Sequence, residues 1–369
     1  MVDKFRLRPH NLKGDTMEQK YDYLVLIGRF QIFHNAHQAL LKEALARAHK
    51  VIVVLGSANK PRMPKNPFLA SEREAMIRAA MGTEVDRLIF LPIRDYYNNE
   101  TWARAVSTAV EARMEKGSLV KIIGHNKDET TAYLQMFPQW GEAFEVRNYY
   151  NINATDLRRL YFQVDNQTAN MVLLSTRVPA TVFDILSAFT HLGDYEMLQK
   201  GFKQLEDYRK AWASAPFPPI FVTVDAVVTC RDHVLMVQRA RFPGEGQWAL
   251  PGGFLNEHEP LRDGVLRELK EETGLSFTNA YLNSLIKDSE VFDYPGRSER
   301  GRTITHAYHI DLGPMGFPQV AGQDDAKDAR WIPISDLAGM EDQIFEDHLA
   351  IIDRFVSIFS SHHLGSDGA

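Results

Sequence analysis

Cysteine is almost missing from this sequence, because Cys230 is the single one among 369 residues. One cysteine excludes an intramolecular disulfide framework and a cysteine-rich zinc site, and it suits a reducing compartment such as the cytoplasm. Long apolar runs are missing too, and no stretch approaches the ~18 residues that indicate a membrane span. A basic excess is also lacking, since the formal net charge is −6, which argues against general nucleic-acid binding. We expect a cytoplasmic protein that binds neither a membrane nor nucleic acid, with Cys230 as a small buried hydrophobe.

The first twenty residues lack the apolar segment that a secretory signal carries. We expect residues 1–20 to form a flexible extension. Repeats of fixed period and low-complexity tracts are also absent from the sequence, which excludes a solenoid or a disordered tail as the source of its length. The composition, 44% hydrophobic and 24% charged, is that of a globular protein. Its length exceeds what one core usually supports, so two domains are expected.

Short apolar runs alternate with helical patterns from Tyr21 onward. The order begins with YLVLIG, AHQALLKEALARAHK and VIVVLGS, and the alternation continues as far as LVKIIGH. Strand, helix and strand in this order are typical of a parallel α/β unit. Residues 21–190 are therefore predicted to form a doubly wound parallel sheet, whose ligands bind at the carboxyl ends of the strands.

A proline cluster at Pro216, Pro218 and Pro219 marks the predicted domain boundary. It follows a polar helical segment, and proline stops a helix because its φ is fixed and its amide hydrogen is missing. We assign residues 191–216 to a helical connector and linker. Residues 217–360 are predicted to form a second domain of α+β class, since they are rich in strands around one central helix.

One stretch in the second domain carries the strongest signal in the chain. It reads GGFLNEHEPLRDGVLRELKEETGL and matches the offsets G-x5-E-x7-R-E-U-x-E-E-x-G-U, in which U is apolar. At roughly 6% usage for each residue type, seven such matches arise by accident on the order of once in 10^8 placements. The matched residues are Gly253, Glu259, Arg267, Glu268, Glu271, Glu272 and Gly274.

Three carboxylates in this stretch, Glu268, Glu271 and Glu272, are spaced to share one face of a helix. Carboxylates that repel one another become favourable when a hard cation lies between them, and Mg²⁺ prefers such ligands. Mn²⁺ is the alternative cation. Gly253 suits a turn that offers its carbonyl to the metal, and Gly274 suits the end of the helix. An isolated acidic helix face is more often merely solvated, but the complete pattern favours a magnesium site.

The pattern is identified as a Nudix box, and the second domain resembles Nudix hydrolases. This resemblance implies Mg²⁺-assisted attack of water on a nucleoside diphosphate. It makes Glu268, Glu271 and Glu272 the metal ligands and catalytic residues, while Arg267 orients them through a salt bridge, expected to be to Glu259.

The residues that flank the box resemble those of ADP-ribose pyrophosphatases, so ADP-ribose is the expected substrate. Expected substrate-binding residues are Trp248 for a base, Arg297 and Arg302 for phosphate, and Asp324 and Asp325 for a further metal ligand or general base. For each arginine or aspartate, a solvated loop remains the alternative. Another nucleoside diphosphate also remains open as the substrate.

A second signal follows the first strand, where GRFQIFHNAH leads directly into a helix. The turn from a strand to a helix N-terminus attracts phosphate through its backbone amides and the helix dipole. In this turn lie Gly28, Arg29 and Phe30, followed by His34 and His37. The sequence therefore predicts a phosphate site at this turn.

A further helix start occurs in NATDLRRL, which contains Thr155 and Arg158. Either Thr155 or Asn153 suits the cap of this helix. The arginine near the capped helix start indicates a second phosphate site.

The two signals together resemble the nucleotidyltransferase superfamily with its HxGH and ISTxxR signatures. GRFQIFHNAH, KNPFLASERE and GHNKDETTAYLQMFP look most like the archaeal-type NMN adenylyltransferases, including those fused to Nudix domains. The likeness covers nearly all of residues 21–190. It implies that the 5′-phosphate of NMN attacks the α-phosphorus of ATP, giving NAD and pyrophosphate, while the protein positions and neutralises the phosphates.

The resemblance also assigns roles to individual residues. It makes His34, His37 and Arg158 catalytic, assigns ATP and its phosphates to Gly28, Arg29, Phe30, Thr155 and Arg158, and assigns NMN to Trp102, Lys127 and Asp128. Trp102 is expected to stack on the cationic nicotinamide ring, with a packed helix tryptophan as the alternative. For Lys127 and Asp128 the alternative is a structural salt bridge. The chain departs from the family pattern at Ile32, Ala36 and Asn153, where proline, glycine and serine are usual.

Two other functions remain open from the sequence. In the first, the Nudix half binds ADP-ribose without hydrolysing it and acts as a sensor. In the second, the first half adenylylates or cytidylylates a different phosphate, in which case the substrate has no aromatic cation for Trp102 to stack on. A homo-oligomer is also left open. Because the candidate residues of each site lie on one side of the boundary, a cut near Ser214 is expected to leave two active pieces.

Overall fold

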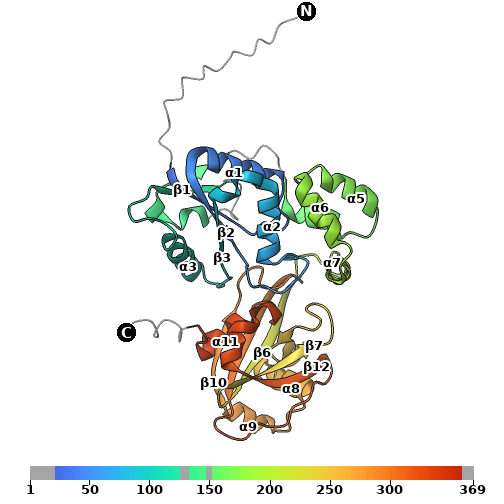
Figure 1. The fold of residues 1–369 in the computed structure, drawn as a ribbon. Coiled ribbons are helices and arrows are strands. Elements are labelled where there is room, and N and C mark those ends of the chain that lie inside the picture. Colours follow the sequence, from blue (N-terminus) through green and yellow to red (C-terminus); the bar gives the residue numbers. More distant parts are fainter. Residues whose placement is uncertain (1–20, 125–132, 147–151, 360–369) are drawn as a thin grey trace, which may run out of the picture.

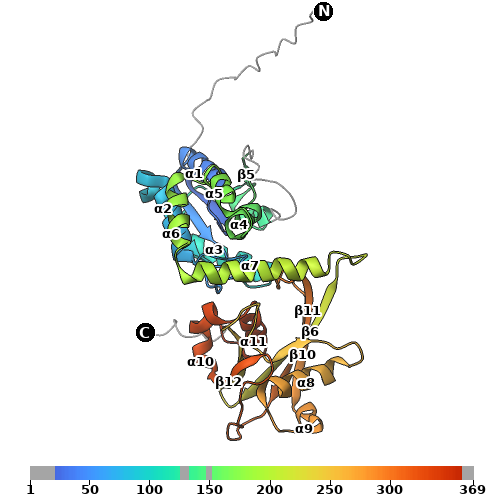
Figure 2. The same ribbon diagram turned by 90° about the vertical axis from the view of Figure 1, so that its right-hand side faces the viewer.

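The computed structural model describes residues 21–124, 133–146 and 152–359. Two lobes lie one above the other, each built on its own sheet, and the chain passes once from the first lobe to the second (Figure 1). Helix α7 (Gly193–Ala211) lies where the lobes meet (Figure 2). The two predicted fold classes are both observed.

The first lobe contains five parallel strands in the order β3-β2-β1-β4-β5. The strands are β1 (Tyr21–Gly28), β2 (Ala48–Leu55), β3 (Leu88–Pro92), β4 (Val120–Gly124) and β5 (Phe144–Glu145). The central strand β1 is apolar on both faces, as a sheet covered on both sides requires. Leu24 and Leu26 belong to one core, and Val25 and Ile27 to the other.

Helices cover both faces of this sheet. They are α1 (Asn35–Arg47), α2 (Ala70–Met81), α3 (Asn99–Glu111), α4 (Ala154–Phe162), α5 (Gln167–Ser175), α6 (Ala180–Phe189) and α7, with 3₁₀ segments η1 (Gly82–Arg87) and η3 (Pro138–Trp140). Residues of α1, α2 and α4 share the core of Leu24. Val106 and Val110 of α3 pack in the core of Val25. The sheet is therefore doubly wound.

Helix α7 differs from the expected connector. Its residues Tyr195 and Leu198 are buried in the first core, and the Tyr195 hydroxyl donates a hydrogen bond to the Tyr161 carbonyl oxygen at 2.7 Å. The polar composition of the segment masks this apolar stripe. The first part of the predicted 191–216 connector is thus an integral helix of the N-terminal lobe.

The second lobe is a mixed sheet in the order β10-β11-β6-β7-β12, with β8 paired to β7 and β9 to β6. Strands β6 and β11 pair in parallel, and the other pairs are antiparallel. The strands are β6 (Ile220–Cys230), β7 (His233–Arg239), β8 (Trp248–Ala249), β9 (Gly252–Phe254), β10 (Ile286–Phe292), β11 (Arg302–Asp311) and β12 (Ala326–Pro333).

Helices pack on both faces of this mixed sheet as well. They are α8 (Leu261–Thr273), α9 (Asn279–Ser284), α10 (Ile334–Leu337) and α11 (His348–Val356), with the 3₁₀ segment η4 (Ala338–Gln343). Helix α8 packs Val265 and Leu269 on one face together with Cys230, which is buried as expected. Helix α11 packs on the other face. Among the helices of the described residues, none is long and apolar enough to cross a membrane.

Candidate active sites

The turn between β1 and α1 holds two imidazoles in a fixed arrangement. His34 caps α1, since its Nδ1 accepts a hydrogen bond from the His37 amide at 3.4 Å, and the two rings stack with centroids 3.6 Å apart. Phe30 has φ of +52° and lies edge-on to His37. A Cβ on Gly28 would lie 2.8 Å from the end of the Phe30 ring, so any larger residue there would force the ring to move. The predicted phosphate turn is thus a packed unit.

Helix α4 brings the second predicted phosphate site to the same turn. Asn153 is its cap, because its Oδ1 accepts the Thr155 amide at 2.8 Å, which resolves the choice between these two residues. The buried guanidinium of Arg158 donates to the Gln31 carbonyl oxygen and, at 3.1 Å, to the Thr155 hydroxyl. Burial lowers the pKa of Arg158 to about 10, so it remains a cation at neutral pH. The structure joins the two motifs that the sequence places far apart.

One residue of this site, Arg73, escaped the sequence analysis. It is 0% exposed, and its guanidinium donates to the carbonyl oxygens of Arg29 and Gly56 at 2.7 Å and of Ser57 at 3.2 Å. It therefore braces the loops that follow β1 and β2. The signal that reveals it is helical spacing, because Arg73 shares one face of α2 with the buried Met76 and Ile77.

A cavity of about 640 Å³ opens at the carboxyl ends of β1 and β2. Its N-terminal side includes Gly28, Arg29, Gly56, Ser57, Trp102, Tyr133 and Met136. Trp102 meets Tyr133 and Phe137 edge-on, with centroids 6.2 and 5.9 Å away, so it is both packed and part of the cavity wall. The other two predicted NMN contacts, Lys127 and Asp128, lie outside the described residues.

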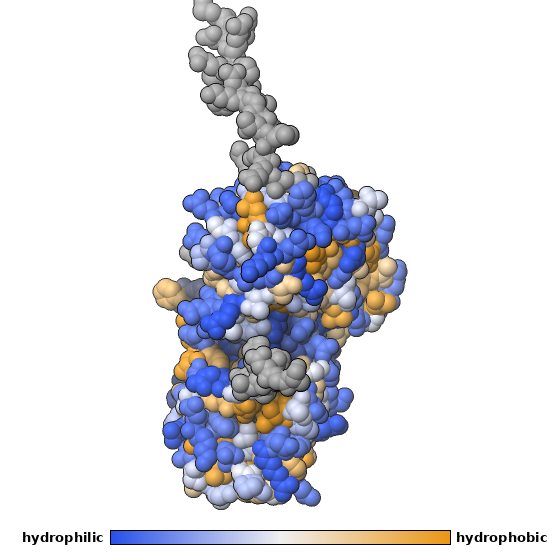
Figure 3. Space-filling model, turned by 60° about the vertical axis from the view of Figure 1, so that its left-hand side comes forward, coloured by the Kyte–Doolittle hydropathy of each residue, from blue (hydrophilic) through white to orange (hydrophobic). Residues whose placement is uncertain are grey.

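The opposite wall of this cavity comes from the other lobe. It consists of residues 294–297 together with Glu299 and Glu346. On the face shown in Figure 3, the surface is hollowed where the lobes meet. The cavity is therefore lined by residues from both sides of the domain boundary, whereas the candidate residues predicted for each site lie on one side of it. This contact was not predictable from sequence patterns, because it joins loops far apart in the chain.

The predicted Nudix helix is α8, and Arg267 organises its carboxylates. Arg267 donates to both carboxylate oxygens of Glu259 at 2.6 and 2.9 Å, and to Glu268 and Glu271 at 2.9 and 2.8 Å. The expected pair between Arg267 and Glu259 is thus confirmed. The hydrogen bond from Arg267 lowers the pKa of Glu259 to about 2. The helix ends at Gly274 with φ of +66°, as predicted.

Two glycines make room for the other carboxylates. The Gly252 amide donates to Glu272 at 2.9 Å, and a Cβ on Gly253 would lie 2.6 Å from Glu268 Oε1. Burial raises the pKa of Glu272 to about 8 and raises that of Glu268. Two desolvated carboxylates therefore flank strand β9, and each lacks the solvation that a charged group needs.

A divalent cation fits this donor set, because it supplies the missing countercharge to oxygen ligands. Glu268, Glu271, Glu272 and the Gly253 carbonyl are the groups that would hold it. Within residues 21–124, 133–146 and 152–359, however, no three acidic, histidine or cysteine side chains converge into a ready site. Arg267 engages Glu268 and Glu271 while Glu272 bonds to Gly252, so the side chains must reorient to share one ion.

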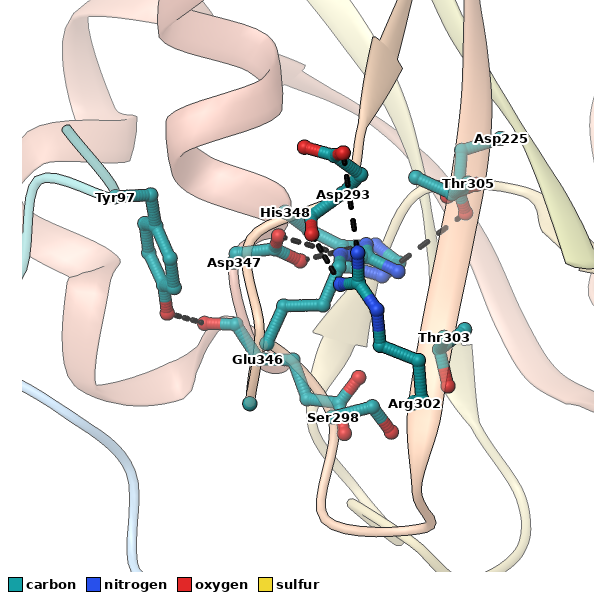
Figure 4. Close-up of polar contacts among 12 residues, drawn as sticks. Tyr97, Asp225, Asp293, Ser298, Arg302, Thr303, Thr305, Glu346, Asp347 and His348 are labelled. Atoms are coloured by element: carbon teal, nitrogen blue, oxygen red, sulfur yellow. Dashed lines mark hydrogen bonds and ion pairs between the residues drawn. The ribbon is translucent and has the colours of Figure 1, made fainter. Parts of the chain in front are cut away.

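The flanking residues have other partners. Arg297 is buried in a pair with Asp347, with both contacts at 2.7 Å, and it lines the cavity between the lobes. This differs from the open phosphate loop that the sequence predicts. Arg302 bonds to the Asp293 carbonyl oxygen and pairs with its carboxylate (Figure 4).

The remaining predicted substrate contacts are the half-buried Trp248 and the exposed Asp324 and Asp325. The Arg330 guanidinium lies over Trp248, with its Cζ 5.6 Å from the centroid of the tryptophan ring. Asp325 pairs with Arg241 at 2.8 Å, and Asp324 is exposed with φ of +50°. None of these contacts joins Trp248, Asp324 or Asp325 to the carboxylates of α8.

A buried carboxylate beside Glu272 was also missed. Asp225 lies in the apolar strand β6, where Thr305 donates to it and His348 lies 3.9 Å away (Figure 4). Burial raises its pKa. A charged residue inside the run FVTVDAVVTC was a usable signal, because an acid in a buried strand needs specific partners.

Comparison with known proteins assigns a class to each lobe. Residues 25–170 match the Cytidylyltransferase-like family, and residues 219–355 match the NUDIX domain. A nicotinamide/nicotinic acid mononucleotide adenylyltransferase of Acinetobacter baylyi is 37% identical over 185 residues, which cover 50% of this chain and 95% of the relative. An ADP-ribose pyrophosphatase of Methanocaldococcus jannaschii is 33% identical over 135 residues, covering 37% of this chain and 72% of the relative.

A solved structure spans both lobes at once. It is a bifunctional NMN adenylyltransferase/ADP ribose pyrophosphatase from Francisella tularensis, complexed with AMP and a manganese ion. It shares 34% sequence identity and superposes with a TM-score of 0.83, covering 91% of this chain and 99% of that chain. The present chain belongs to this family of bifunctional NMN adenylyltransferase/ADP-ribose pyrophosphatases.

Proposed function

We propose that this chain makes NAD from ATP and NMN in its first lobe and hydrolyses ADP-ribose to AMP and ribose 5-phosphate in its second. The observation that carries the first activity is the contact of Arg158 with the β1–α1 turn, beside a cavity that contains Trp102. The observation that carries the second activity is the packing of the α8 carboxylates Glu268 and Glu272 against strand β9. We further propose Mg²⁺ as the cation, with Mn²⁺ as a substitute, and the cytoplasm as the location.

Adenylyl transfer needs charge neutralisation and positioning more than a nucleophilic side chain. The NMN phosphate oxygen forms a bond to the α-phosphorus of ATP, the bond from that phosphorus to the bridging oxygen breaks, and pyrophosphate leaves. His34 and His37 lie at the N-terminus of α1, where the helix dipole also favours an anion. Arg158 adds a fixed positive charge. Together they favour the charge that develops on the phosphates.

In the hydrolysis assigned to the second lobe, water forms a bond to one phosphorus of the diphosphate, and the bond from that phosphorus to the bridging oxygen breaks, so that ADP-ribose gives AMP and ribose 5-phosphate. A bound divalent cation would lower the pKa of this water and neutralise the phosphate charge. The protein holds Glu268 and Glu271 through Arg267, and it holds Glu272 through the Gly252 amide. A buried carboxylate without a cation is costly, so these groups favour the metal-bound state.

One assay with the purified full chain tests both activities. The protein is incubated with Mg²⁺ and either ATP with NMN or ADP-ribose alone, and the products are identified by mass. We expect NAD with pyrophosphate in the first mixture, and AMP with ribose 5-phosphate in the second. Binding of ADP-ribose without products contradicts the hydrolase, while a mixture of ATP and NMN that yields no NAD contradicts the NAD-forming reaction.

A further inference from the structure

The wall that the second lobe adds to the cavity is held firmly against the first lobe. Within this wall, Tyr294 packs edge-on against Tyr97 with ring centroids 5.7 Å apart. The Gly296 carbonyl oxygen accepts a hydrogen bond from the Lys65 ammonium at 3.0 Å. Tyr97 also donates to the main-chain oxygen of Glu346 (Figure 4). The loop is therefore placed by contacts to both lobes.

Glu299 is the member of this wall with an unmet bonding requirement. It is 8% exposed, and its Oε1 accepts the Lys65 amide at 3.0 Å. Its carbonyl oxygen accepts from Arg209 on α7 at 2.8 Å. Oε2 has no hydrogen-bond donor in the described part of the chain and is itself covered by neighbouring atoms, although the residue lines the cavity, so a nucleotide reaches Oε2 after a small rotation of the side chain. A buried acceptor without a donor costs free energy that a bound donor would recover.

The surrounding charges indicate which donor fits. Arg29 and Lys65 line the same cavity, and Glu299 acts to raise the pKa of Arg158 against the larger lowering effect of burial. These cations mark the end of the cavity where phosphate binds. In a nucleotide, the group next to phosphate is the ribose, and carboxylates commonly accept hydrogen bonds from ribose hydroxyls.

We propose that Glu299, a residue of the Nudix domain, binds the nucleotide of the adenylyltransferase pocket, with Oε2 accepting a hydrogen bond from a ribose hydroxyl. The inference rests on the proposed NAD-forming activity of the first lobe. The pocket would then bind its nucleotide with residues of both domains. The second domain then contributes to the first reaction without taking part in its chemistry.

The test compares Glu299→Gln, Glu299→Ala and the wild type as full chains. Glutamine keeps an oxygen for the Lys65 amide but replaces the second acceptor with a donor. At pH 8, above the pKa of about 7 to which burial raises Glu299, we expect Glu299→Gln to raise KM for ATP or NMN by about tenfold to a hundredfold, the range for a hydrogen bond to a charged group. Its kcat should change little, because the contact exists before and during the reaction. Isothermal titration with the affected nucleotide alone should show the same weakening.

The matched control is Glu245→Gln. Glu245 also forms an ion pair across the lobes, with Lys200 at 3.1 Å, but both side chains are exposed and neither lines the cavity. ADP-ribose hydrolysis and the thermal midpoint show that each variant is folded. An unchanged KM in Glu299→Gln, with loss only in Glu299→Ala, would show a purely structural residue and overturn the inference. A wild type that forms no NAD would instead overturn the proposed function.

Discussion

Arg158 on α4 donates a hydrogen bond to the carbonyl oxygen of Gln31, in the turn that leads to the histidines of α1. This contact joins the early and the late motif of the first lobe into one site. It places a permanent positive charge beside a helix N-terminus, where phosphate binding is expected.

Replacement of Arg158 by alanine should lower kcat for NAD formation by about 10²- to 10³-fold, the usual cost of losing one charged donor to a transition state. The neighbouring Arg159→Ala is the control, because that side chain is 64% exposed and pairs with Glu206 on α7. Steady-state kinetics of both variants measure the effect. Equal activity of the two would contradict the role of Arg158.

His37→Ala should lower the rate of NAD formation mainly through kcat, by roughly tenfold or more, since a donor to the phosphates matters most when charge builds in the transition state. The KM values should change little. ADP-ribose hydrolysis in the same preparation serves as the control for folding. If kcat is unchanged in a folded variant, the stacked histidines have a structural role.

Local patterns were sufficient to predict the parallel sheet of the first lobe and the box helix of the second. The helix α8, its end at Gly274 and the pair between Arg267 and Glu259 follow from spacing within a short segment. Contacts across long separations were not predictable. The sequence predicts Arg297 as a phosphate contact, because its partner Asp347 lies far away in the chain. Glu299 lies in no periodic pattern that would place it against the first lobe.

Gly252→Ala should disable the hydrolase. A Cβ at this position would lie 2.9 Å from the Asp225 Cα and would also meet the Val224 carbonyl oxygen, and neither of these backbone atoms can swing aside. We expect a loss of roughly 1–3 kcal/mol in the free energy of unfolding, as for overpacking. Gly339→Ala is the control, since no heavy atom lies within 4 Å of its added Cβ. Urea unfolding and ADP-ribose hydrolysis of both variants measure the difference.

Glu299 should make stability depend on pH. Burial raises its pKa from 4.5 to about 7 in the folded protein, so between these values the folded chain retains a proton that the unfolded chain has lost. Stability contributed by this group is therefore present below about pH 4.5 and is lost as the pH rises through 7. The thermal midpoint of the wild type should fall relative to that of Glu299→Gln between pH 5 and 8. A constant difference would contradict the raised pKa.

The central claim is that one chain carries two separate chemistries, and Glu272→Gln tests it most directly. The variant removes a charged ligand from the proposed metal site, so hydrolysis of ADP-ribose with Mg²⁺ should fall at least about a hundredfold. NAD formation in the same preparation should remain nearly intact. The control is Glu257→Gln, whose side chain is 88% exposed outside helix α8 and which should preserve both activities. Full hydrolysis by Glu272→Gln, or equal loss of both activities in a folded variant, would contradict the account.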